Sequence, residues 1–165
     1  SPMSRGLGDV YKRQALDHLK DCWDKKGSLG VVMLDLDHFK EINDQFGHGV
    51  GDVVLEAVAT RWRRCTRSGD QLYRMGGEEF LLLCPRADEG VTVLAAERLR
   101  RSLEEQPITT DAGPIAVTLS AGVAARTLPM NSHHALLRAA DRALYRAKDS
   151  GRNQIRRESS QRRAG

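Results

Sequence analysis

Two consecutive glycines in the middle of the chain, Gly76 and Gly77, constrain its fold more than any other feature. They separate residues 71–75 from residues 80–84, and both segments have the short, apolar character of β-strands. A tight turn between two strands requires residues that accept unusual backbone angles, and glycine does so at the lowest cost. The glycine pair therefore predicts a β-hairpin, whose antiparallel pairing excludes a doubly wound, all-parallel sheet.

Helical and strand-like patterns alternate on both sides of this hairpin. Residues 29–36 are apolar on both faces, as in a strand at the centre of a sheet. Asp52 is well placed to serve as the N-cap of the helix that follows it. The hydrophobic spacing predicts helices over residues 15–26, 38–46, 52–66, 88–105 and 132–149, and further strands over residues 115–124 and 154–156. This order predicts an α+β fold in which helices flank a mixed, mainly antiparallel sheet.

Composition places the chain among globular proteins. Its 165 residues are 40% hydrophobic and 29% charged, which excludes disordered, collagen-like and fibrous chains and suits one domain. The longest apolar run, residues 29–34, is too short to span a bilayer, and the N-terminus lacks the apolar core of a signal peptide. Three cysteines, Cys22, Cys65 and Cys84, follow neither a metal-binding nor a disulfide spacing. We therefore expect a cytoplasmic protein with no membrane contact within this chain.

The positive charge is concentrated at the C-terminus. The formal net charge is +4, but residues 141–165 alone contain eight Lys or Arg against three Asp or Glu. Such a tail is usually solvated, and the aromatic content of 5% leaves few platforms on which nucleic-acid bases could stack. The charge pattern thus disfavours a nucleic-acid polymer as partner and favours a compact phosphate ligand.

Two acidic segments are the strongest candidates for a functional site. Asp35 and Asp37 end an apolar strand on the same face, and Glu78 and Glu79 directly follow the two glycines. If the hairpin lies beside this strand, Asp35 and Glu78 converge, and paired carboxylates are suited to holding Mg²⁺ around a triphosphate. The alternative is that the first segment merely solvates a strand end and the second is an ordinary charged turn.

The motifs around these acidic residues resemble those of the GGDEF family, the bacterial diguanylate cyclases. Residues 74–80, Arg-Met-Gly-Gly-Glu-Glu-Phe, resemble the family signature in its Glu variant. The similarity runs from about residue 15 to residue 155, with further matching blocks at residues 35–40, 43–44, 46–48, 51–52 and 147–153. It implies a palm-like sheet, related to those of nucleotidyl cyclases and polymerases. It also implies a transient antiparallel homodimer that joins two GTP into cyclic di-GMP and releases pyrophosphate.

The resemblance also implies roles for individual residues. Asp35, Glu78 and the Leu36 carbonyl would ligate Mg²⁺ or Mn²⁺, with two ions per GTP, and Glu79 resembles the residue that helps to deprotonate the 3′-hydroxyl. The implied substrate-binding residues are Lys40, Lys148 and Arg152 for the phosphates, Asn43 and Asp52 for the guanine edge, and Gly76 and Gly77 for close approach of the nucleotide. Each has a structural alternative: a helix N-cap for Asp52, a turn residue for Asn43, and a solvated helix end for Lys148 and Arg152.

A second motif precedes the hairpin. Arg67 and Asp70 have the Arg-x-x-Asp spacing of the inhibitory product site of the family, and Arg98 lies where a further arginine of that site is expected. A guanidinium can bind a guanine edge or a phosphate through two hydrogen bonds, while the carboxylate accepts from the base. The alternative is a salt bridge within a loop and an arginine on a solvated helix face.

The first residues differ from the rest of the chain. Residues 1–14 show no clear amphipathic period, and residues 9–14 resemble a translated sequencing adapter. We therefore expect a non-native leader over residues 1–14, a GGDEF domain over residues 15–157 and a basic tail over residues 158–165. The block that precedes the first helix in the family, Asp-x-Leu-Thr-Gly-Leu-x-Asn-Arg, is then lost. We expect that an upstream sensor domain and any membrane anchor of the parent protein are lost as well.

Two functions from different classes are compatible with these residues. The first is an active diguanylate cyclase. The second is a catalytically inactive receptor that binds GTP or cyclic di-GMP and signals through a partner. Receptors of this kind usually lack a metal-binding or turn residue, whereas all four residues from Gly76 to Glu79 are present here. The sequence therefore favours the enzyme.

Overall fold

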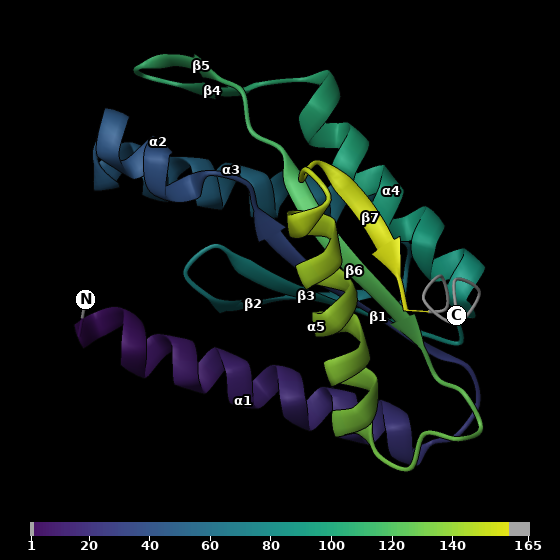
Figure 1. The fold of residues 1–165 in the computed structure, drawn as a ribbon. Coiled ribbons are helices and arrows are strands. Elements are labelled where there is room, and N and C mark those ends of the chain that lie inside the picture. Colours follow the sequence, from purple (N-terminus) through teal and green to yellow (C-terminus); the bar gives the residue numbers. More distant parts are fainter. Residues whose placement is uncertain (1, 159–165) are drawn as a thin grey trace.

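The computed structural model describes residues 2–158, with side chains from residue 12 onward. The chain forms helices and strands in the following order: α1 (Pro2–Asp24), β1 (Leu29–Leu36), α2 (Phe39–Phe46), α3 (His48–Cys65), β2 (Gln71–Gly76), β3 (Glu79–Pro85), α4 (Glu89–Glu105), β4 (Ile108–Thr110), β5 (Gly113–Ile115), β6 (Leu119–Ala125), α5 (His133–Asp149) and β7 (Gln154–Arg157). Figure 1 shows the sheet with these helices around it. Among the described helices, none is both long and apolar enough to cross a membrane.

The main sheet has the strand order β2-β3-β1-β6-β7. Strand β1 pairs antiparallel with β3 and β6, β2 pairs antiparallel with β3, and only the β6–β7 pair is parallel. The mixed, mainly antiparallel sheet is therefore confirmed, as is the hairpin between β2 and β3. Gly77 has a φ of 34° in the turn, which explains why glycine is needed there.

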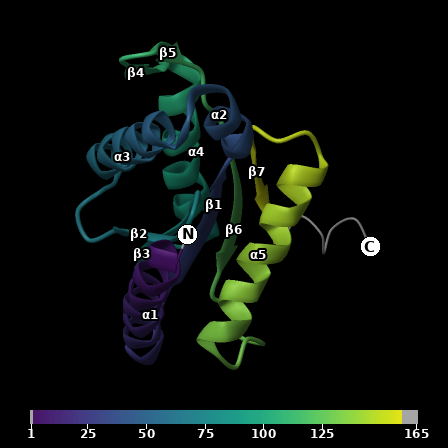
Figure 2. The ribbon, with the colours of Figure 1, turned by 90° about the vertical axis from the view of Figure 1, so that its left-hand side faces the viewer.

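Strand β1 is buried along its whole length because helices cover both faces of the sheet. On one face, Val32 and Leu34 belong to a cluster that includes Trp62 of α3 and Leu99 of α4. On the other face, the alternate β1 residues pack in a second cluster with side chains of α1 and α5. Figure 2 shows α3 and α4 on one side of the sheet and α5 on the other. The period-two alternation of a central strand thus places Asp35 at the end of a fully covered strand.

Helix α5 lies unusually close to the sheet at Gly122. A Cβ atom on Gly122 would lie 2.1 Å from the Ala140 carbonyl oxygen and 2.2 Å from the Leu144 nitrogen, so only glycine allows this approach. The contact fixes the height of α5 above β6. Because Lys148 lies one turn beyond Leu144, the contact also fixes where the C-terminal end of α5 meets the end of β1.

The predicted start of α3 is wrong. The helix begins at His48, after Gly47 with a φ of 90°, and Asp52 lies in the second turn instead of at the N-cap. The positive φ of Gly47 separates α2 from α3, so α3 begins at His48, four residues before Asp52.

The single strand predicted over residues 115–124 is also wrong. The chain forms β5 first, leaves strand geometry at residues 116–118 and then enters β6. Strand β5 pairs with the unpredicted strand β4, because the turn between Thr110 and Gly113 folds the chain back on itself. At the N-terminus, α1 extends from Pro2, through most of the segment expected to be a leader.

Candidate active site

The two acidic segments meet at the C-terminal end of the central strand β1. Asp35 is the register partner of Glu79 in the β1–β3 pair, and the Leu36 amide donates to the Glu78 carbonyl oxygen at 3.2 Å. The structure therefore brings together the acidic residues that lie 43 positions apart in the sequence. Their convergence follows directly from the antiparallel pairing that the glycine turn imposes.

Asp35 is buried and forms an ion pair with a residue of α5. The Lys148 ammonium donates to Asp35 Oδ2 at 2.6 Å. Burial raises the pKa of Asp35, Lys148 opposes this shift, and the carboxylates of Glu78 and Asp37 add to it. Since a buried carboxylate is costly unless a cation accompanies it, Lys148 supplies the positive charge that this position requires.

Asp35, Glu78, Glu79 and Lys148 form one group at the end of β1, which we call the corner, and Glu79 is its solvent-exposed carboxylate. Partial burial raises the pKa of Glu79, the nearby Asp35 carboxylate raises it further, and Lys148 acts in the opposite direction. A carboxylate with a raised pKa is a better proton acceptor than an ordinary one, because its conjugate acid is more stable. The environment of Glu79 thus suits a general base.

Asp141 of α5, which the sequence interpretation missed, is exposed but lies near enough to this corner to influence Glu79. Its carboxylate contributes to the raised pKa of Glu79. Burial raises the pKa of Asp141 itself, and Lys12 and Lys148 oppose that shift. The signal was available in the sequence: Asp141 precedes Lys148 by seven residues, or two helical turns, so both residues share one face of α5.

The residues of the corner fit a magnesium or manganese ion that is shared with a substrate. Within residues 12–158, no three His, Cys, Asp or Glu side chains are arranged to hold a metal ion by themselves. Mg²⁺, however, usually takes one or two carboxylates and completes its coordination with water and phosphate oxygens. Asp35 and Glu78 supply that number of carboxylates. The Lys148 ammonium on Asp35 also shows that a cation is accommodated at this carboxylate.

The other predicted phosphate-binding residues surround this corner less closely. Arg152 is exposed in the turn that follows α5, where its φ is 64°. Lys40 is exposed on α2, directly after the buried Phe39. Lys148 therefore contacts Asp35 in this structure, whereas the Arg152 and Lys40 side chains are exposed to solvent.

The residues expected to recognise guanine lie at the start of α3. Asp52 is exposed, and the residue before it, Gly51, packs directly against the Asn43 side chain. A Cβ on Gly51 would lie only 1.8 Å from Asn43 Oδ1. Gly51 is thus a second residue whose role the sequence interpretation missed, because it provides the space that the Asn43 carboxamide occupies.

Two of the three residues of the predicted product site, Arg67 and Asp70, are hydrogen-bonded to each other. Arg67 Nε donates to Asp70 Oδ1 at 2.9 Å, and Arg67 Nη2 donates to the Pro85 carbonyl oxygen at 2.7 Å. The loop salt bridge considered as the alternative is therefore present. Asp70 is nearly fully buried, and its Oδ2 atom has no hydrogen-bond partner among the described residues. Arg98 is exposed on α4 and lies near enough to influence Cys84, which the Asp70 carboxylate also affects.

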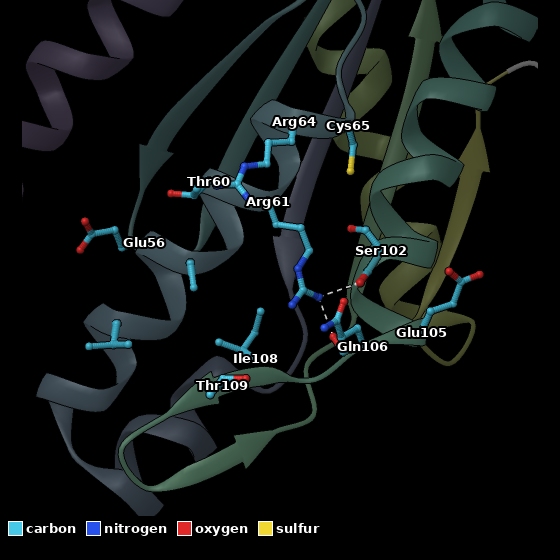
Figure 3. Close-up of a pocket in the computed structure, with 12 residues that line it drawn as sticks. Glu56, Thr60, Arg61, Arg64, Cys65, Ser102, Glu105, Gln106, Ile108 and Thr109 are labelled. Carbon is cyan, nitrogen blue, oxygen red and sulfur yellow. Dashed lines mark hydrogen bonds between the residues drawn. The ribbon is translucent and has the colours of Figure 1, made fainter.

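A groove of about 740 Å³ lies on another part of the molecule, between α3, the C-terminal end of α4 and β4 (Figure 3). Its central side chain, Arg61, donates to the carbonyl oxygens of Ser102, Gln106 and Pro107 and so caps α4. None of the predicted site residues lines this groove. Its main cation is already engaged in joining α3 to α4, so the corner at Asp35 is the better candidate for the active site.

Comparison with known proteins identifies the family. Residues 9–154 match the family model described as diguanylate cyclase, GGDEF domain, six residues earlier than the domain boundary expected from the sequence. Diguanylate cyclase A of Treponema denticola is 42% identical over 132 residues, which cover 80% of this chain and 36% of that protein. The chain thus spans about a third of the length of this curated relative.

Solved structures agree with this assignment. The GGDEF domain of DgcB from Caulobacter crescentus, described in complex with c-di-GMP, has a TM-score of 0.83 and 30% identity, and the match covers 90% of each chain. The active GGEEF domain of a diguanylate cyclase from Vibrio cholerae has a TM-score of 0.83 and 28% identity, with 89% of this chain and 96% of that chain covered. The palm-like, nucleotidyl-cyclase-like fold is therefore confirmed, and the chain belongs to the GGDEF family of diguanylate cyclase domains.

Proposed function

We propose that this domain is a diguanylate cyclase, which condenses two GTP molecules into cyclic di-GMP and releases two pyrophosphates. The observation that carries the proposal is the meeting of Asp35 with Glu78 and Glu79 at the glycine turn, with Lys148 bound to Asp35. A relative that bears the name diguanylate cyclase and a related domain described with c-di-GMP support the same activity.

Each residue of the corner has a role in this proposal. Asp35, Glu78 and the Leu36 carbonyl would hold two Mg²⁺ or Mn²⁺ ions per GTP. When bound, these ions neutralise the phosphates and the charge that builds up on the leaving pyrophosphate. Lys40, Lys148 and Arg152 bind the phosphates, and Gly76 and Gly77 let the nucleotide lie close to the backbone. Asp52 accepts from the N1 and N2 donors of guanine, which adenine lacks, and Asn43 forms hydrogen bonds to the same edge of the base.

The reaction takes place between two copies of the domain. Each copy presents one GTP in a transient antiparallel dimer, and the 3′-oxygen of one nucleotide forms a bond to the α-phosphorus of the other. The bond between the α-phosphorus and the bridging oxygen breaks, and pyrophosphate leaves with that electron pair. Glu79 accepts the proton of the 3′-hydroxyl, as its raised pKa favours.

Product inhibition at Arg67, Asp70 and Arg98 belongs to the same proposal. Arg67 is now held by Asp70 and the Pro85 carbonyl, so a bound product has to share or replace these hydrogen bonds. The exposed Arg98 offers a second guanidinium to a phosphate of the product. Arg67→Ala is expected to relieve inhibition by added cyclic di-GMP with little change in the initial rate.

A turnover assay tests the proposal. The protein is incubated at high concentration with GTP and Mg²⁺, and cyclic di-GMP is quantified for the wild type, for Glu78→Gln and for Glu105→Gln. Glu105 is an exposed carboxylate at the end of α4 and serves as the matched control. We expect product from the wild type and the control and none from Glu78→Gln. Turnover by a folded Glu78→Gln variant would contradict the metal-binding role, whereas binding of cyclic di-GMP without any wild-type turnover would favour the receptor.

A further inference from the structure

Asp37 is a buried carboxylate to which the reaction above assigns no role. It is 5% exposed and lies two residues after Asp35, just beyond the end of β1. Its Oδ1 atom accepts from Ser120 Oγ at 2.6 Å, and its Oδ2 atom accepts from Thr118 Oγ1 at 2.6 Å and from the Asn153 amide at 3.0 Å. Ser120 belongs to β6, and Thr118 directly precedes that strand. Asn153 belongs to the turn that also contains Arg152.

The turn after α5 adopts a backbone that needs support. Arg152 and Asn153 have φ angles of 64° and 47°, and neither is glycine. Such a conformation costs free energy and persists only where surrounding contacts impose it. The Arg152 amide donates back to the Ala147 carbonyl oxygen at 3.0 Å, and the next amide, that of Asn153, is the one that Asp37 accepts.

Helix α4 holds the same turn from the other side. Asn153 Oδ1 accepts from Arg100 at 3.1 Å, and Asn153 Nδ2 donates to Glu104 at 2.7 Å. Arg100 in turn pairs with Glu97 and Glu104, both at 2.6 Å. Asn153 is therefore fixed through its backbone by Asp37 and through its side chain by α4, while the neighbouring Arg152 side chain remains exposed.

We propose that Asp37 is a positioning residue for phosphate binding. By accepting the Asn153 amide, it holds the turn in the conformation that directs Arg152 toward the triphosphate, beside Lys148. This inference rests on the proposed role of Arg152 in binding GTP. Asp37 itself contacts no substrate, and its effect on affinity passes through the turn.

The choice of substitutions follows from the hydrogen bonds. Asp37→Ala removes the acceptor for Asn153. Asp37→Asn keeps an acceptor for Asn153, because the oxygen of the new carboxamide accepts from Asn153 and Thr118. The amide group of the carboxamide donates to the Ser120 hydroxyl, which then acts as acceptor. Ser120→Ala is the matched control, because it leaves a buried Asp37 oxygen unpaired without touching the turn.

The experiment measures the Kd of 3′-deoxy-GTP with Mg²⁺, since this analogue binds but cannot react through the missing hydroxyl. Thermal unfolding is recorded in parallel. Asp37→Ala is expected to weaken binding by about tenfold, the equivalent of one well-oriented contact to phosphate, whereas Asp37→Asn and Ser120→Ala stay within about threefold of the wild type. If Asp37→Ala does not fold, Asp37→Ser replaces it, because the serine hydroxyl is too short to reach the Asn153 amide.

A double-mutant cycle with Arg152→Ala separates the possible failures. Once Arg152 is absent, Asp37→Ala is expected to add less than about twofold, because its effect depends on that side chain. If Arg152→Ala alone leaves the Kd unchanged, the proposed phosphate role of Arg152 is wrong. If Arg152→Ala weakens binding but Asp37→Ala does not, or if Asp37→Ala weakens binding equally in both backgrounds, the positioning role of Asp37 is overturned.

Discussion

Replacing Gly51 by alanine tests whether the Asn43 carboxamide, in the position seen here, recognises guanine. The added Cβ would lie 1.8 Å from Asn43 Oδ1, 3.0 Å from Asn43 Cγ and 3.3 Å from Phe39 Cζ. Because non-bonded heavy atoms settle at about 3.5 Å, the carboxamide oxygen has to retreat by roughly 1.7 Å. A displacement of that size breaks any hydrogen bond that Asn43 makes to the base.

The magnitude follows from the cost of one lost hydrogen bond. Loss of one hydrogen bond to the base at this partly exposed position costs about 0.5–1.5 kcal/mol, which corresponds to about 2- to 13-fold weaker binding of GTP. The substitution also adds about 1 kcal/mol of helix propensity, since alanine replaces glycine within α3. Thermal stability is therefore not expected to fall together with affinity.

Gly49→Ala is the matched control. Gly49 lies in the same turn of α3, and a Cβ added there meets nothing within 4 Å. Both variants thus gain the same helix propensity, and only Gly51→Ala displaces Asn43. The assay is the Kd of 3′-deoxy-GTP with Mg²⁺, measured together with thermal unfolding. Wild-type affinity in a folded Gly51→Ala variant would refute the role of Asn43 in this conformation.

Three further predictions concern Lys148, Cys84 and Gly122. Lys148→Met is expected to raise the affinity of the nucleotide-free protein for Mn²⁺, because no ammonium then competes for Asp35; an unchanged affinity in a Mn²⁺ titration would contradict this competition. Burial, followed by the Asp70 carboxylate, raises the pKa of Cys84 to about 12. About one molecule in ten thousand then carries this thiolate at pH 8, so a thiol reagent should label Cys84 only after unfolding, and rapid labelling of the native protein would argue against its burial. Gly122→Ala is expected to destabilise the fold by about 3 kcal/mol or more in urea denaturation, because its Cβ meets helix backbone that cannot rotate away; a loss below about 1 kcal/mol would mean that α5 shifts freely.

The features that the sequence predicted correctly are those fixed by local chemistry. Helix α4 begins after Asp88, whose side chain accepts from the Val91 amide, and α5 begins after Ser132, whose side chain accepts from the Ala135 amide. Both caps lie where the hydrophobic spacing placed the helix starts. The hairpin was predictable for the same reason, because a glycine turn and two flanking strands are a local pattern.

The features that the sequence interpretation missed depend on neighbours distant in the chain. Strands β4 and β5 have three residues each, too few to show a period of two. The Lys148–Asp35 ion pair joins residues 113 positions apart, and the contact between Asp37 and Asn153 joins residues 116 positions apart. Both contacts depend on how closely α5 approaches the sheet. That close approach is possible because Gly122 has no side chain.

The charge balance at the end of β1 predicts that, in the proposed function, the substrate and a divalent cation bind together. The carboxylates of Asp35, Glu78 and Glu79 gather at this corner, and one ammonium, that of Lys148, contacts Asp35. The raised pKa values of Asp35 and Glu79 show that this single ammonium does not fully compensate for burial and mutual repulsion. A triphosphate alone would add further negative charge to this corner, and Lys148 cannot serve both Asp35 and the phosphates at full strength. In the proposed function, Asp35 would hold a divalent ion, and Lys148, which contacts Asp35 in this structure, would then be available to the phosphates.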